Sequence, residues 1–205
     1  MKILVNFFAN INEVSVNQMI NFVTQNIFNA QSQKIEMKDL ELVIQIASNG
    51  GSSDHGLLAY NYLKQLDIKK TTINMSNVDS AAVLIFCAGD ERYSTDISRF
   101  TLHEAITTVQ GAFNSEKIHE IANLNKRITD DYTKVIQKVT GQKIKQLSNK
   151  IKDGYVLDTQ EAIKIKLATK ILNEPYIKTT NGVNALIITN PIQQSQQAQQ
   201  KAVEN

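Results

Sequence analysis

The chain has 205 residues, of which 42% are apolar and 20% are charged, a composition typical of one folded domain and not of a disordered or fibrous chain. Its net charge of +2 comes from 22 basic and 20 acidic residues without a basic run, so a nucleic-acid partner is not expected. No stretch approaches the ~20 apolar residues that cross a bilayer, so a membrane partner is not expected either.

Cys87 is the only cysteine and lies in an apolar run, which excludes an intramolecular disulfide and favours a buried thiol in a reducing, cytoplasmic compartment. The N-terminus places Lys2 before apolar residues, but asparagines interrupt the run and no small-residue cleavage site follows. We therefore interpret this stretch as a first strand and not as a signal peptide.

Three strand-to-helix units open the chain. Each unit pairs a short β-prone run with apolar residues at helical spacing, and the third passes through Asp79 and Ser80 into an alanine-rich apolar stretch. The strands are expected at residues 3–8, 40–47 and 71–75, and the helices at about 14–27, up to about 66, and 81–88. Successive β-to-α units predict right-handed crossovers and a mainly parallel sheet, with functional groups at the strand-to-helix turns.

The second half of the chain alternates short elements with one long helix. Residues 114–138 carry apolar side chains along one side, and a helix of this length is expected to protrude or to form an interface. Short strands are expected at 91–93, 100–103 and 169–172, and shorter helices at 142–152 and 159–167. The apolar patch at 183–188 fits either an edge strand or a subunit contact, and the glutamine-rich residues 193–200 are expected to form a loose tail.

Ser80 and His103 are the candidates for chemistry. Ser80 precedes a helix, where a serine is most often an N-cap, but a hydroxyl there also lies beside unpaired backbone N–H groups. A histidine is the base that makes a serine hydroxyl nucleophilic near neutral pH, and His103 closes a short strand. We interpret His55 and His119 as structural residues.

The glycine pair Gly50-Gly51 follows the second strand and indicates a tight turn with positive φ. Such a turn can also expose a backbone amide. If the turns after the second and third strands lie side by side, the N–H groups of Gly51 and Ala81 converge on one oxygen and form an oxyanion hole.

The order of these motifs resembles the proteolytic subunit of Clp protease and its relatives over roughly residues 2–173. The matching segments are Ser48-Asn49-Gly50-Gly51, Asp79-Ser80-Ala81-Ala82, Ala88-Gly89-Asp90, Phe100-Thr101-Leu102-His103, Gln110-Gly111, Thr140-Gly141-Gln142 and Leu157-Asp158-Thr159-Gln160-Glu161-Ala162. The sequence differs at Asn49, Ala81-Ala82 and Glu104-Ala105, where the family commonly has proline, Met-Gly and Gln-Pro.

The resemblance implies a ClpP/crotonase-type α/β fold, built from repeated β-β-α and β-α units with a protruding long handle helix. It implies a peptidase domain over residues 1–175 and a C-terminal extension over 176–205. Ser80 would be the nucleophile, His103 the general base, and the Gly51 and Ala81 amides the oxyanion hole, with no cofactor or metal. The resemblance also implies a homo-oligomer of heptameric rings that cleaves polypeptides. A partnership with an AAA+ unfoldase stays open, because the chain begins close to its first strand.

The acid of a Ser-His-Asp triad has more than one candidate in this sequence. A gapless match to the family places Gly154 where the family has its aspartate, and Asp153 is one residue away. Asp153 is therefore the first candidate and Asp158 the second. A pair without an acid, which retains part of the catalysis, is the third alternative.

Two other functions compete with a serine endopeptidase. A catalytically impaired Clp-like subunit would assemble without being acylated. An enoyl-CoA hydratase-like enzyme would share the fold and the paired amides, but it requires catalytic carboxylates and a CoA site that the sequence does not indicate.

Overall fold

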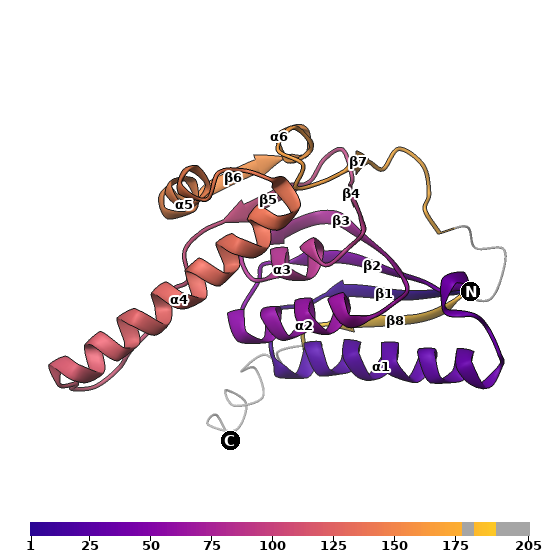
Figure 1. Cartoon of the computed structure of the whole chain (residues 1–205), viewed down its shortest axis with the longest axis horizontal. Helices are drawn as coiled ribbons and strands as arrows, with labels where there is room; N and C mark the ends of the chain where they lie inside the picture. Colours follow the sequence, from indigo (N-terminus) through magenta and orange to yellow (C-terminus); the bar gives the residue numbers. More distant parts are fainter. Residues whose placement is uncertain (178–182, 192–205) are drawn as a thin grey trace, which may run out of the picture.

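The structure is a computed structural model that describes residues 1–177 and 183–191 (Figure 1). Strands β1 (Lys2–Phe8), β2 (Glu41–Ser48) and β3 (Lys69–Asp79) alternate with helices α1 (Glu13–Ser32), α2 (Ser53–Gln65) and α3 (Ala82–Cys87). After these come β4 (Glu91–Ser94), β5 (Arg99–Leu102), α4 (Ser115–Thr140), α5 (Ile144–Asp153), β6 (Tyr155–Asp158), α6 (Thr159–Lys164), β7 (Lys170–Ile171) and β8 (Asn184–Thr189), with a short 3-10 helix at Met37–Asp39.

One sheet organises the described chain, with the strand order β6-β5-β3-β2-β1-β8. Every pairing is parallel except that of β5 with β6. Strand β3 changes partner along its length, because Thr71 to Asn74 pair with β4 and Asn77 to Asp79 pair with β5. The far end of β3 therefore lies next to β5, which leads to His103.

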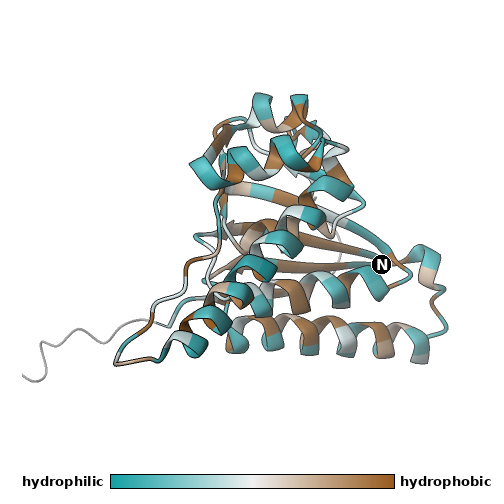
Figure 2. Cartoon of the chain, turned by 60° about the vertical axis from the view of Figure 1, so that its left-hand side comes forward, coloured by the Kyte–Doolittle hydropathy of each residue, from teal (hydrophilic) through white to brown (hydrophobic). Residues whose placement is uncertain are grey.

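The two faces of the sheet are covered differently. Alternate residues of β1 and β2, such as Val5 and Ile44, point to one face and join the main core with the helices, whereas Leu4 and Val43 point to the other face. That second face is covered by Leu172, Tyr176, Ile177 and Val183 from the C-terminal part of the chain. Figure 2 shows the central strands as mostly hydrophobic, as expected for a sheet that is buried on both faces.

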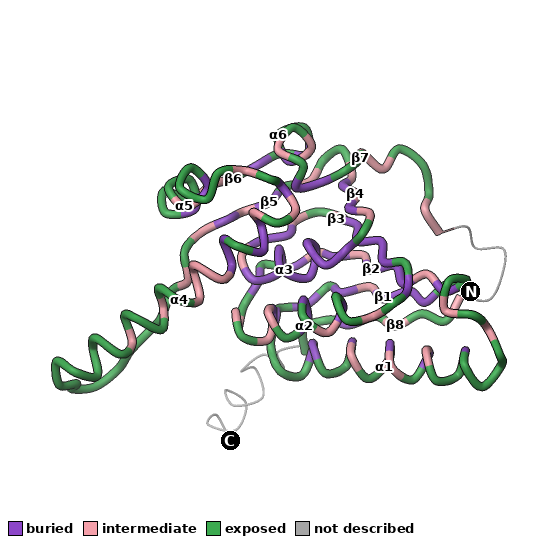
Figure 3. Tube along the Cα trace, in the orientation of Figure 1, coloured by how far each residue is buried: buried purple, intermediate pink, exposed green. Residues whose placement is uncertain are grey.

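Helix α4 leaves the body of the molecule at its N-terminal end. It begins after Asn114, whose side chain accepts a hydrogen bond from the Lys117 N–H, and it ends at Gly141 with φ 69°. Its buried residues all lie in the second half, from Tyr132 to Thr140, and Figure 3 shows the first half as mostly exposed. The long helix expected at 114–138 is confirmed.

The order of strands and helices agrees with the sequence-based expectation, with two differences. Strand β3 continues to Asp79, whereas the expected strand ended at Met75. Strand β6 was not expected; it forms because Leu157 is buried against β5 through antiparallel pairing with Phe100. The patch at 183–188 forms an edge strand, β8, beside β1. The tail at 193–200 lies outside the described residues.

None of the helices in the described part of the chain combines the length and the apolar character that a membrane span requires. The same residues contain no cluster of three or more histidine, cysteine or acidic side chains that could hold a metal ion.

Candidate active site

Ser80 occupies the tight turn between β3 and α3 and has a positive φ of 53°. Its N–H donates to the Thr101 carbonyl at 2.7 Å, which ties the turn to the neighbouring strand β5. The N-cap of α3 is Ala81, and no side chain caps this helix. Ser80 therefore does not have the capping role that serine most often has before a helix, and a residue that carries a Cβ is strained at this positive φ.

The turn that follows β2 touches the turn of Ser80. A Cβ atom on Gly50 would lie 2.7 Å from both the Ser80 Cβ and the Asp79 carbonyl oxygen, and Gly50 has a φ of 89°. Gly51, with φ 141°, approaches the backbone of Ile11 so closely that a Cβ would collide with it. The two turns lie side by side, as the oxyanion-hole hypothesis requires, and only glycine fits at these two positions.

The Gly51 and Ala81 N–H groups are the expected oxyanion donors. Within residues 1–177 and 183–191, neither of these amides donates a hydrogen bond to another part of the chain. The neighbouring amides do have partners: the Gly50 N–H donates to Ser48 Oγ at 3.1 Å, and the Ser52 N–H donates to the Ile11 carbonyl at 2.8 Å. Neither N–H group is thus committed to a partner within these residues, as the oxyanion-hole hypothesis requires.

His103 follows the last residue of β5 and is partly buried. Asp79 at the end of β3 pairs with Thr101, so His103 lies two residues beyond the level of Asp79, at the same end of the sheet as Ser80. Its Nδ1 lies 2.7 Å from the carbonyl oxygen of Glu104. No hydrogen bond joins Ser80 to His103 in the described structure.

The two candidate acids lie at opposite ends of β6. This strand is antiparallel to β5 and pairs Tyr155 with Leu102, so Gly154 and Asp153 come next to the level of His103. Asp158 pairs with Arg99 at the far end and caps α6 by accepting the Glu161 N–H at 2.8 Å. The register thus brings Asp153 nearer to His103 than Asp158, although no hydrogen bond between Asp153 and His103 is present in the described residues.

Asp79 is a site residue that sequence reasoning did not single out. Its carboxylate is buried and pairs with the Arg99 guanidinium at 2.9 Å, and Asn77 Nδ2 also donates to it at 3.1 Å. The ion pair joins β3 to β5 immediately before the serine. An acidic residue directly before Ser80 was the available signal, because an acidic residue is rarely buried without a partner.

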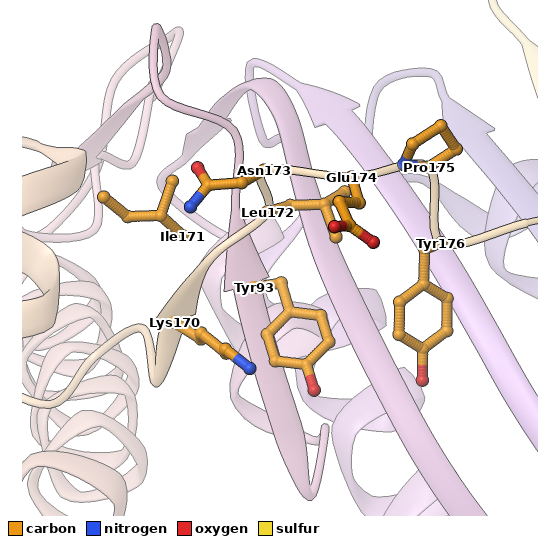
Figure 4. A pocket seen from close by; sticks show the side chains of 8 residues that line it. All are labelled: Tyr93, Lys170, Ile171, Leu172, Asn173, Glu174, Pro175 and Tyr176. Atoms are coloured by element: carbon orange, nitrogen blue, oxygen red, sulfur yellow. The ribbon is translucent and has the colours of Figure 1, made fainter.

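Two cavities of the described residues lie outside the candidate site, since no candidate catalytic residue lines either of them. One of about 220 Å³ lies between α2, α3 and α4, one helical turn beyond Ser80; it is lined by Ser53, Asp54, Leu57, Leu84, Leu124, Arg127, Ile128, Asp131 and Tyr132. A larger cavity of about 450 Å³ lies between β4 and the C-terminal segment and is lined by Tyr93 and by residues from Lys170 to Tyr176 (Figure 4). The larger cavity contains none of the candidate catalytic residues.

The fold and the site together define a ClpP-like α/β protein with a serine in a strained strand-to-helix turn. The model of the Clp protease family matches residues 5–175, and the chain therefore belongs to this family. It is 28% identical over 137 residues to ATP-dependent Clp protease proteolytic subunit 2 of Borreliella burgdorferi, an alignment that covers 66% of this chain and 68% of that protein.

Other comparisons agree with this assignment. The subunit 2 of Pseudomonas aeruginosa is 26% identical over 140 residues, which covers 66% of this chain and 68% of that protein. Among solved structures, a point mutant of ClpP1 from Listeria monocytogenes has the same fold, with a TM-score of 0.71 and 19% identity over 83% of this chain and 91% of that one.

Proposed function

We propose that the protein is a serine endopeptidase that hydrolyses unfolded or short polypeptides through an acyl-enzyme on Ser80. The observation that carries this proposal is the position of Ser80. It lies in a strained turn in contact with Gly50, and it shares the end of the sheet with His103. Positive φ is uncommon for a residue with a side chain, and strained residues of this kind cluster at active sites.

The reaction requires only groups that this site contains. The His103 Nε2 takes the proton of the Ser80 hydroxyl as its oxygen attacks the peptide carbonyl carbon. The Gly51 and Ala81 N–H groups stabilise the oxyanion that forms. The imidazolium then gives its proton to the leaving amine, and a water molecule, activated by the same histidine, hydrolyses the ester.

Asp153 is the carboxylate that we propose for orienting His103, if a carboxylate serves that purpose. Its support is the β5–β6 register, which brings residues 153 and 154 to the level of the histidine. Asp158 has less support, because it already caps α6 and lies opposite Arg99.

We further propose that the protein works in the cytoplasm as an oligomeric chamber of heptameric rings. The first half of α4 supports an assembly role, since Ile118 and Leu124 are 56% and 57% exposed on a helix that leaves the body of the molecule. Larger apolar surfaces of this kind mark interaction sites.

A catalytically impaired Clp-like subunit is the second candidate. The observation in its favour is that Ser80 and His103 are not hydrogen-bonded in the described structure and that no carboxylate contacts the histidine there. Catalytic hydrogen bonds are often long without substrate, so this geometry is also compatible with an active enzyme.

The test is covalent labelling with a fluorophosphonate, followed by intact-mass measurement. We expect one adduct on the assembled wild-type protein and none on Ser80→Ala, with labelling of His103→Ala slowed by a factor on the order of 10³ or more. Ser76→Ala is the matched control, because Ser76 is an exposed serine of the same strand. An assembled wild-type protein that stays unlabelled would favour the impaired subunit.

A further inference from the structure

The loop that follows His103 is fastened to the handle-like helix α4 by side chains of that helix. The Ala105 N–H donates to Thr129 Oγ1 at 3.1 Å, and Asn125 Nδ2 donates to the Ala105 carbonyl at 2.9 Å. The Asn125 amide is itself held, because Thr107 Oγ1 donates to its Oδ1 at 2.8 Å. Both backbone groups of Ala105 are thus bonded to α4.

The Ala105 N–H belongs to the same planar peptide unit as the Glu104 carbonyl, so the two groups cannot rotate independently. This carbonyl is the group that lies 2.7 Å from His103 Nδ1. The bond from the Ala105 N–H to Thr129 therefore fixes the direction of the carbonyl on the other side of the peptide plane. A continuous set of contacts runs from α4 to the imidazole.

We propose that the peptide unit between Glu104 and Ala105, held by Thr129 and Asn125, orients His103 in place of a carboxylate, so that Thr129 and Asn125 are positioning residues for the reaction. The inference rests on the proposed serine peptidase function. It replaces the acid of the triad by a backbone carbonyl, and it makes α4 part of the catalytic machinery as well as a surface for assembly.

The chemistry follows from the donor and acceptor properties of imidazole. A carbonyl oxygen can only accept, so it selects the tautomer with the proton on Nδ1 and leaves the lone pair on Nε2 for the Ser80 proton. This selection is the main service of the acid in a triad. A neutral carbonyl stabilises the imidazolium less than a carboxylate does, so acylation should be slower than in a full triad.

The carboxylates nearby do not compete for Nδ1 in this structure. Asp158 accepts the Glu161 N–H, and Asp153 is the exposed last residue of α5. Next to it, Gly154 has positive φ, and a Cβ there would meet nothing within 4 Å. Gly154 is the residue opposite His103 when the β5–β6 register is continued by one position, and it leaves open space where a side chain would otherwise lie.

The test compares second-order rates of fluorophosphonate labelling among four full-length variants. Thr129→Val keeps the side-chain shape and removes the acceptor, and we expect labelling to slow about tenfold, the factor that corresponds to one ordinary hydrogen bond. Thr129→Ser keeps the hydroxyl and should restore the wild-type rate. Thr133→Val is the matched control, because the Thr133 hydroxyl donates within α4 to the Thr129 carbonyl at 2.8 Å. Asp153→Asn tests the competing hypothesis, because a carboxylate that orients His103 would make this variant label far more slowly than Thr129→Val.

A second measurement does not depend on the variants. Nitrogen-15 NMR of the wild-type imidazoles at a pH where His103 is neutral should show the His103 proton on Nδ1, and a proton on Nε2 would overturn the proposal. Equal rates for Thr129→Val and wild type would overturn it as well. A fall in the labelling rate of Asp153→Asn by a factor of about 10² or more would also overturn the proposal, but this result would leave the proposed peptidase function intact. A wild-type protein that does not label at all would instead contradict the proposed function.

Discussion

Gly50 and Ser80 lie in two adjacent turns that leave no room for another carbon atom between them. The contact is to the Ser80 Cβ and the Asp79 carbonyl, so the shape of the serine turn depends on a residue from a different turn, much earlier in the chain. Positive φ at Gly50 adds a second reason for glycine, because an L-residue there is strained.

Gly50→Ala should therefore destabilise the protein by about 3 kcal/mol and abolish labelling of Ser80, since the strain falls on the turn of Gly50 and the collision on the turn of Ser80. Gly141→Ala separates the two effects: Gly141 also has positive φ, at 69°, but nothing lies within 4 Å of its Cβ position. This control should cost only about 1 kcal/mol and keep full labelling. Urea unfolding and intact mass measure both quantities, and equal costs for the two variants would contradict the argument.

At the scale of residues, the sequence indicates site residues that lie next to a predicted strand, but not contacts between segments that are distant along the chain. Ser80, His103 and the glycine pair could be proposed from the sequence because each lies at or beyond the end of a predicted strand, and parallel strands bring such turns to one end of a sheet. Thr129 and Asn125 were not recognisable, because polar residues on a solvated helix face carry no signal of a loop that bonds to them. The identity of the orienting group stays a prediction.

At the scale of elements, the C-terminal segment is bound to the sheet by one acidic residue. Glu41, at the start of β2, accepts hydrogen bonds from Tyr176 Oη and Thr71 Oγ1 and forms ion pairs with Lys2 and Lys69. Burial alone would raise the pKa of Glu41, but these hydrogen bonds outweigh it and lower the pKa to about 2. The segment that covers the second face of the sheet is thus anchored by a carboxylate.

The pH dependence of stability tests this anchor. Because the folded-state pKa of Glu41 is below its unfolded value of 4.5, its stabilising contribution is complete above pH 4.5 and is lost as the pH falls toward 2. The contribution amounts to at most roughly 3 kcal/mol. Tyr176→Phe should reduce the loss of unfolding free energy in this window, and Glu41→Gln should remove the part due to Glu41.

Tyr155→Phe is the control for that series, because the Tyr155 hydroxyl accepts a hydrogen bond from the exposed Lys150 amine and lies far along the chain from Glu41. It should keep the wild-type slope between pH 4.5 and 2. A Tyr176→Phe protein with the same slope as wild type would show that the phenol does not lower the pKa of Glu41.

Helices and strands with a long, regular apolar pattern were predicted from the sequence, whereas a short strand without such a pattern was missed. Helices α1 and α4 were expected because their apolar residues recur at helical spacing over several turns. Strand β6 was missed because it has four residues, and only Leu157 among them is buried. The position of β8 depended on pairing with β1, far away in sequence, so its sequence could indicate a strand without indicating its neighbour.

At the scale of the whole molecule, the first half of α4 exposes large apolar side chains, among them Ile118 and Leu124. Ile118→Asp should reduce the mass of the assembly measured by light scattering, because it places a charge on an exposed apolar position of the proposed interface. The unfolding temperature of the protomer should hardly change, since Ile118 is 56% exposed within it. Asn123→Asp, on an exposed polar position of the same helix, should leave the mass unchanged.

The left-handed conformation of Ser80 also bears on the choice between an enzyme and an inert subunit. Glycine would occupy this turn with less strain, so a serine there makes the folded state less stable than the same backbone would allow. A subunit with no reaction to perform gains nothing from that sacrifice of stability. The strained serine therefore supports the proposal that Ser80 is a nucleophile, whichever group orients the histidine.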